Sequence, residues 1–131
     1  RGEECGGEGM NGLAVALGAA LGALVRWQAG VWLNSRHPQL PLGTLAVNVV
    51  GGLLIGMALV LLARPDQQLW RLLVITGFLG GLTTFSAFSG ESLALIQRGA
   101  WGWALAHSLL HLLGALGAAA LGSWLAQRLM A

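Results

Sequence analysis

The sequence predicts an all-α membrane protein with four transmembrane helices and a broken third helix, and three observations lead to this fold class. Of the 131 residues, 56% are hydrophobic and only 9% are charged, whereas an ordinary soluble domain carries about 25% charged residues. The apolar residues form four stretches, each near the roughly 20 residues that a helix needs to cross a bilayer. Glycine supplies 21 residues, an excess typical of membrane helices that pack closely. A water-soluble globular domain is therefore excluded.

The polar segment that precedes the first apolar stretch is expected to be a disordered leader. It comprises residues 1–9 and contains Cys5, the single cysteine, so the chain cannot form an internal disulfide. Met10 is a candidate natural start. We expect residues 10–131 to form one four-helix transmembrane domain.

The four expected spans are separated by short polar breaks. Tryptophans near their ends, Trp32, Trp70, Trp101 and Trp124, match the usual interfacial anchors. The spans run from about Leu13 to Leu33, Leu42 to Ala63, Trp70 to Ile96 and Trp101 to Leu125. Small-residue packing between them is expected at Gly18–Gly22, Gly52–Gly56 and Gly114–Gly117.

The basic residues give little orientation preference. With four spans and the leader set aside, one side of the membrane receives Arg64, Arg71 and Arg128, and the other receives Arg36 and Arg98. Arg26 joins the second side if it extends out of the first span. Because cytoplasmic loops normally carry the excess of positive charge, this near balance favours dual topology and an antiparallel homodimer. A single orientation that these counts fail to determine is the alternative.

The third expected span contains a cluster of helix-weakening residues. Thr76 to Ser92 reads TGFLGGLTTFSAFSGES, and each interior glycine costs a helix about 1 kcal/mol. This pattern predicts a break near Gly80–Thr83, whose freed carbonyls could coordinate a cation. A flexible, tightly packed helix with Ser and Thr bonded to the preceding turn is the alternative.

Aromatic and amide side chains add candidate ligands for an anion. Phe85 and Phe88 share a helix face, and the positive edges of their rings could contact an anion, although such pairs more often serve packing. In the second span, Thr44 and Asn48 also share a face. They form either a clamp between helices or part of a polar pathway.

The remaining intramembrane polar groups are few. Arg26 lies in the first span, where a charge indicates function or anchoring, and Glu91 in the third span could pair with it or face water. The fourth span carries His107, Ser108 and His111. The i, i+4 histidines can bind a metal, but the base of an HExxH motif is missing and the sequence has no other cluster of metal ligands, so hydrogen bonding or a polar lining is favoured.

The sequence contains none of the common enzyme signatures. There is no Walker loop, dinucleotide fingerprint, GxSxG motif or convergent pair of carboxylates. We therefore expect a conduction or binding role rather than an enzyme.

Two segments resemble the signature motifs of the Fluc/CrcB family of fluoride channels. These are GTLAVNVVGG at 43–52 and GFLGGLTTFSAFS at 77–89, and LGALVRW at 21–27 is similar to the family's arginine-bearing first helix. The resemblance covers Met10 to the C-terminus. It implies a fluoride-selective channel of the cell inner membrane that exports F⁻ passively and protects against fluoride toxicity. It also implies an antiparallel dual-topology homodimer with two pores and a central structural Na⁺.

The resemblance also implies roles for individual residues. The Phe85 and Phe88 ring edges would meet fluoride beside the Asn48 amide, Na⁺ would be held by the backbone carbonyls of Gly80 and Thr83, and Arg26 would stand at the vestibule. The other residues implied for the fluoride pathway are Thr44, Ser86, Ser89, His107, Ser108 and His111. The fourth helix departs from the family, which has a Tyr/Ser/Thr track where this chain has histidines and no tyrosine.

Two other function classes compete with the channel. A small dual-topology drug/proton antiporter has a similar length and span count, but it needs a carboxylate in the first span, which has none. A non-conducting assembly protein would leave the predicted break and the phenylalanine pair unexplained.

Overall fold

The protein is helical throughout the part that the structure describes. The computed structural model describes the backbone of residues 2–131 and side chains from Gly6 onward. The longer helices are α1 (Gly2–Leu33), α2 (Leu42–Leu61), α5 (Phe85–Gln97) and α6 (Trp101–Met130). The shorter elements are η1 (Asn34–Arg36), η2 (Pro65–Gln67), α3 (Gln68–Arg71), η3 (Leu72–Leu79) and α4 (Gly80–Leu82). The all-α prediction is confirmed.

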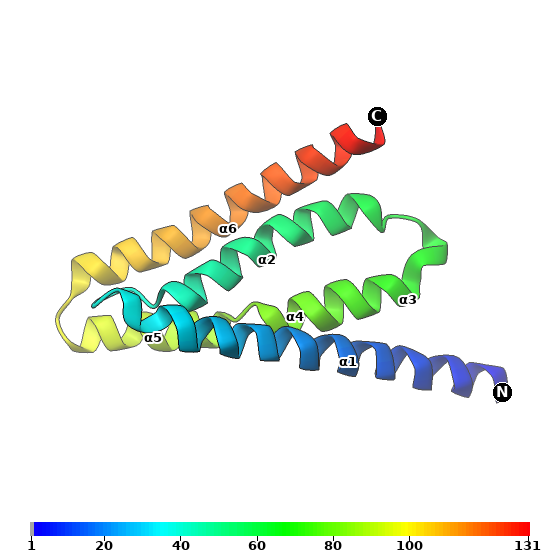
Figure 1. The fold of residues 1–131 in the computed structure, drawn as a ribbon, viewed down its shortest axis with the longest axis horizontal. Helices are drawn as coiled ribbons and strands as arrows, with labels where there is room; N and C mark the ends of the chain where they lie inside the picture. The colour runs from blue at the N-terminus through cyan, green and yellow to red at the C-terminus, as the bar shows by residue number, and fades with distance from the viewer. Residues whose placement is uncertain (1) are drawn as a thin grey trace.

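The four predicted spans are also confirmed. The candidate membrane spans are Gly6–Arg36, Leu42–Leu61, Pro65–Gln97 and Trp101–Met130. In Figure 1 successive spans run in opposite directions along the long axis, so both termini and the α2–α3 connection lie at one end of the bundle. Large apolar side chains such as Trp27, Trp70 and Trp101 are mostly exposed. Such an apolar exterior would be unfavourable in water and suits contact with lipid.

The structure differs from the sequence prediction at the N-terminus. Residues 1–9 are expected to be disordered, whereas α1 begins at Gly2, and residue 1 lies outside the part that the structure describes. The side chains of residues 6–10 are exposed, and a Cβ added at Gly6, Gly7 or Gly9 would contact nothing. Residues 6–10 therefore continue the backbone hydrogen bonds of α1 beyond the bundle without tertiary support.

Close glycine contacts hold the helices together in two pairs. Gly52 and Gly56 of α2 pack against the backbone of Ala115 and Ala119 of α6, and Gly18 and Gly22 of α1 pack against the third span. A Cβ at any of these four glycines would collide with backbone atoms, so the predicted packing there is confirmed. At Gly114–Gly117 it is wrong for Gly117, which faces open space.

The third span is divided into several elements. It runs through α3, the π-helical η3, α4 and α5. Between α4 and α5, Thr83 (φ −86°, ψ 156°) and Thr84 (φ −150°, ψ 116°) have extended backbone. The predicted break is centred on the glycine pair, but Gly80 and Gly81 are helical. The extended residues are the two β-branched threonines that follow, because branching at Cβ disfavours the helix.

The two parts of the third span lie against different helices. The residues of η3 and α4 pack along α1, whereas α5 packs against α6. A small core cluster of Val47, Leu79 and Leu82 lies just before the extended threonines. The fold thus brings α2, α5 and α6 together around Thr83 and Thr84.

Candidate functional site

The side chain of Asn48 holds the extended segment of the third span. Its Oδ1 accepts from the Thr84 N–H (2.8 Å), and its Nδ2 donates to the Thr84 carbonyl (3.1 Å). The amide thereby pairs with one residue as a neighbouring β-strand would. Because buried backbone groups need partners, Asn48 satisfies the polar groups that the end of the helix leaves free.

Two backbone carbonyls lose their usual helical partners at this segment. In an uninterrupted helix, the N–H of Thr84 would bond to Gly80 and the N–H of Ala87 to Thr83. Here the Thr84 N–H donates to Asn48, and the Ala87 N–H donates to Thr84 Oγ1 (3.1 Å). The carbonyls of Gly80 and Thr83, which the resemblance assigns to Na⁺, are thus released from the ladder.

A groove of about 800 Å³ runs along one face of the protein beside this segment. Its walls come from α2, the third span and α6. Most of the lining is apolar, and the polar side chains are few. The polar side chains are those of Asn48, Thr83, Thr84, Ser108 and His111. The rings of Phe85 and Phe88 also line the groove.

Four rings form a continuous aromatic row from α5 to α6. Phe85 and Phe88 lie 5.4 Å apart between ring centroids. Phe88 stacks on His107 at 5.2 Å with an angle of 4° and meets His111 at 5.0 Å. Phe85 is 79% exposed, whereas His107 and His111 are 1% and 6% exposed. The row therefore leads from the open groove into the buried interface of α5 and α6.

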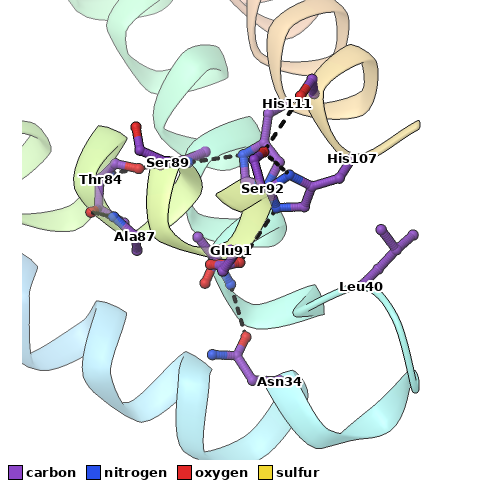
Figure 2. A network of polar contacts seen from close by, with 12 residues as sticks. Asn34, Leu40, Thr84, Ala87, Ser89, Glu91, Ser92, His107 and His111 are labelled. Carbon is purple, nitrogen blue, oxygen red and sulfur yellow. Dashed lines mark hydrogen bonds and ion pairs between the residues drawn. The ribbon is translucent and has the colours of Figure 1, made fainter. Parts of the chain in front are cut away.

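Figure 2 shows how polar contacts fix the two histidines. The Nδ1 of His107 lies 2.8 Å from the Ser92 hydroxyl, which also lies 3.4 Å from the Ser108 hydroxyl. The Nδ1 of His111 lies 3.0 Å from Asn48 Nδ2. Since that amide nitrogen is a donor, His111 Nδ1 accepts and a neutral His111 carries its proton on Nε2.

Not every predicted site residue lies at the groove. Thr44 is buried at the start of α2, where its N–H donates to Asn34 Oδ1 (3.1 Å). The hydroxyls of Ser86 and Ser89 bond locally, to Thr84 Oγ1 and to the Phe85 carbonyl. None of these three residues lines the groove.

Arg26 and Glu91 have separate partners in the structure. The Arg26 Nε donates to the Gly81 carbonyl at 2.9 Å, so this arginine contacts the C-terminal turn of α4 from α1. Glu91 Oε2 lies 3.5 Å from His107 Nε2. Of the two environments predicted for Glu91, the pair with Arg26 is not formed.

Sequence reasoning missed two residues of the site. Thr84 is the N-cap of α5 through its hydroxyl, and a Thr before a new helical run is a recognisable cap signal. Ser92 contacts both His107 and Ser108. Its role depends on how α5 and α6 pack, and no local pattern in the sequence indicates it.

Comparison with known proteins identifies the family of the chain. The profile of the family described as "CrcB-like protein, Camphor Resistance (CrcB)" matches residues 13–123. A protein of Bordetella petrii named "Fluoride-specific ion channel FluC" is 57% identical over 115 residues, covering 86% of this chain and 88% of the relative. Proteins of the same name are 54% identical in Cupriavidus pinatubonensis (86% and 90% covered) and 49% identical in Burkholderia pseudomallei (91% and 94% covered). On this evidence, the chain belongs to the CrcB family.

Proposed function

We propose that this chain is a fluoride-selective ion channel that lets F⁻ leave the cell passively and so protects it against fluoride toxicity. Its relatives are named fluoride-specific ion channels, and the chain is a multi-pass membrane protein with four spans. The function is ion transport rather than catalysis. We place the protein in the cell inner membrane.

The groove beside Thr83 and Thr84 carries this proposal. A conducting pathway must replace the water shell of an ion with groups of its own. For fluoride, these groups are hydrogen-bond donors or the positive edges of aromatic rings. The groove supplies the Ser108 hydroxyl, the His111 ring and the edges of Phe85 and Phe88. Asn48 lines the same wall and holds His111 by its amide. The route that we propose follows this row of side chains.

The other predicted pathway residues have supporting roles in this proposal. His107 stacks under Phe88 and orients its ring. Ser86 and Ser89 lie beside the two phenylalanines on α5, and Arg26 places a positive charge next to α4. Thr44 lies at the buried start of α2 on the same helix as Asn48. Each of these side chains adds a donor or a positive charge near the route without lining the groove.

We further propose that the active unit is an antiparallel homodimer of dual topology with two pores. The groove is open along one face of the subunit, and Phe85 projects into it with 79% of its surface exposed. A second copy would cover this face. The charges at the two ends, Arg64, Arg71 and Arg128 against Arg36 and Arg98, support insertion in both orientations.

A central Na⁺ belongs to the same proposal. The carbonyls of Gly80 and Thr83 are released from the helical ladder because Asn48 and Thr84 Oγ1 take the N–H groups that would bond to them. Both residues line the exposed groove. Carbonyl oxygens fit a hard monovalent cation, so these two groups from each subunit would hold Na⁺ and add a positive field between the pores. The third span then acts as a discontinuous membrane helix.

Ion efflux from proteoliposomes tests the channel. Purified protein in vesicles loaded with F⁻ should release it rapidly when the membrane potential is clamped, whereas vesicles loaded with Cl⁻ should show little release. Absence of F⁻ release, or equal release of both ions, would contradict the proposal.

Cysteine labelling tests the topology. Ser35→Cys in a Cys5→Ser background should react with an impermeant reagent from both sides of the membrane, because half of the copies face each way. Labelling from one side alone would contradict dual topology and leave the channel proposal standing.

A further inference from the structure

Three buried ligand atoms converge between α5 and α6. They belong to Glu91, His107 and His111, and one ligand atom of each residue lies within 4.8 Å of the other two. Glu91 Oε2, His107 Nε2 and His111 Nε2 are buried and have no hydrogen-bond partner, although Glu91 Oε2 and His107 Nε2 approach each other at 3.5 Å as an ion pair. Buried polar atoms are normally paired. Three buried groups that gather this closely without a hydrogen bond among them favour a ligand that bonds to all three.

The outer contacts of the two histidines orient this set. Ser92 lies at His107 Nδ1 (2.8 Å) and Asn48 lies at His111 Nδ1 (3.0 Å). These contacts leave both Nε2 atoms free of hydrogen bonds, and Figure 2 shows the His107 ring in contact with Glu91. In metal sites, the histidine nitrogen that does not bind the metal is usually held by a hydrogen bond in this way.

The chemistry of the three groups selects the class of ligand. One carboxylate and two imidazoles, with histidines at i, i+4 on one helix, are a common ligand set for Zn²⁺, which leaves a fourth position for water or an anion. Ca²⁺ and Mg²⁺ prefer oxygen ligands alone. A bare anion would meet the charge of Glu91. We propose that Glu91, His107 and His111 form a binding site for Zn²⁺ or a similar divalent transition metal.

The tautomer of His111 predicts a coupling between this site and the extended segment. In the metal-free protein the Asn48 amide donates to Nδ1, so the ring proton is on Nε2. Binding a metal at Nε2 moves this proton to Nδ1 and breaks the contact with Asn48, because two donors would then face each other. One hydrogen bond is lost and three metal–ligand bonds form. His111 also lines the groove, so the bound metal would lie beside the proposed fluoride route.

Metal binding to the purified protein tests the site directly. The Cys5→Ser protein without a histidine tag is titrated with Zn²⁺ in chloride buffer by calorimetry, and Co²⁺ is followed by its visible absorption. We expect one Zn²⁺ per subunit and intense Co²⁺ bands. His107→Gln and His111→Gln should each weaken binding at least about tenfold, as the loss of groups in metal sites usually does.

The third histidine of the chain provides the matched control. His37 lies in the α1–α2 connection, where its Nδ1 accepts from Gln39 and Leu40, and His37→Gln should bind Zn²⁺ as before. Where a histidine variant fails to fold, Glu91→Gln replaces it, since this change keeps the size of the side chain. The site is wrong if the parent protein takes up no Zn²⁺, or if His37→Gln weakens binding as much as the cluster variants.

Fluoride efflux with and without Zn²⁺ tests the link to transport, which rests on the proposed function. Saturating Zn²⁺ should slow efflux by the parent protein at least about tenfold and leave each variant at its own metal-free rate. Zn²⁺ binding without slower efflux would contradict the link and keep the site. Absence of efflux before any metal is added would contradict the proposed function alone.

Discussion

The two parts of the third span, before and after Thr83 and Thr84, pack through different groups: the first through backbone atoms and the second through side chains. In η3 and α4, Gly77 and Gly81 lie against α1 so closely that no side chain separates the two backbones. In α5, Phe88, Glu91 and Ser92 meet the histidines of α6 through rings and polar atoms. One span thus forms a glycine interface in which two backbones touch and a second interface made of aromatic and polar side chains.

The extended segment is what allows this change of partner. A single straight helix presents one stripe of residues to one neighbour, whereas α4 contacts α1 and α5 contacts α6. The change of direction occurs where Asn48 replaces the missing helical bonds of Thr84. We infer from this comparison that close glycine packing positions the extended segment of Thr83 and Thr84. The extended segment in turn brings Phe85 and Phe88 to the groove.

Removing the amide that supports the segment should give the largest effect. Asn48→Ala loses both bonds to Thr84 and the contact with His111. Each unsatisfied buried group costs about 1–3 kcal/mol, so we expect a loss of at least about 3 kcal/mol in the free energy of unfolding and no measurable F⁻ efflux. Thermal unfolding in detergent and vesicle efflux measure the two quantities.

A conservative change at the same position separates the role of the Asn48 amide nitrogen, which is the donor, from the role of its oxygen, which is the acceptor. Asn48→Asp keeps the acceptor for the Thr84 N–H but cannot donate to the Thr84 carbonyl. Its stability should lie between those of the parent and Asn48→Ala. Equal stability of the alanine variant and the parent would show that the amide does not support the segment.

The glycine interface should give the second largest effect. A Cβ at Gly22 would collide with the backbone of Phe78 and Leu82, and overpacking of this kind costs about 1–3 kcal/mol. Gly22→Ala should lower the midpoint of thermal unfolding. Gly12→Ala, on the same helix with open space around it, should leave it unchanged or raise it, because alanine favours the helix. Equal shifts in the two variants would contradict the close packing.

Periodicity and composition were sufficient to predict the spans and the close packing of Gly18–Gly22 and Gly52–Gly56. Apolar length determines where a helix crosses the membrane, and Gly52-x-x-x-Gly56 is a local pattern. The position of the extended residues could not be predicted in the same way. Glycine weakens a helix, but Gly81 is helical and packs against the backbone of Ala19, and the extended residues are Thr83 and Thr84, where Asn48 pairs with the Thr84 backbone.

The candidate site was predicted least well where it depends on the packing of α5 against α6. Phe85, Phe88 and Asn48 could be named from motifs, Ser108 and His111 could be named as polar residues of the fourth span, and all five line one groove. The role of Ser92 and the approach of Glu91 to the histidines arise from contacts across two helices. A third ligand for the histidine pair is therefore visible only in the structure.

The exposed ring of Phe85 distinguishes function from packing. Because this side chain is 79% exposed in the subunit, Phe85→Ile should change subunit stability little, while the loss of the ring edge should slow F⁻ efflux by about tenfold, or about 1.4 kcal/mol in the barrier. Leu93→Ile, a change at another exposed position on α5, is the control. Equal effects of the two variants on efflux would remove the ring from the pathway.

The smallest effect tests the polar interface of α5 and α6. Ser92→Ala removes the hydroxyl 2.8 Å from His107 Nδ1 and leaves a nitrogen of a ring that is 1% exposed without a partner. We expect a loss of about 1 kcal/mol in the free energy of unfolding. Ser89→Ala removes a hydroxyl that bonds only to its own helix at an exposed position, and its stability should stay within about 0.5 kcal/mol of the parent. If Ser89→Ala costs as much as Ser92→Ala, the hydroxyls act through helix propensity. The polar contacts of α5 would then orient the histidines without stabilising the fold, in contrast to the glycine contacts of α4.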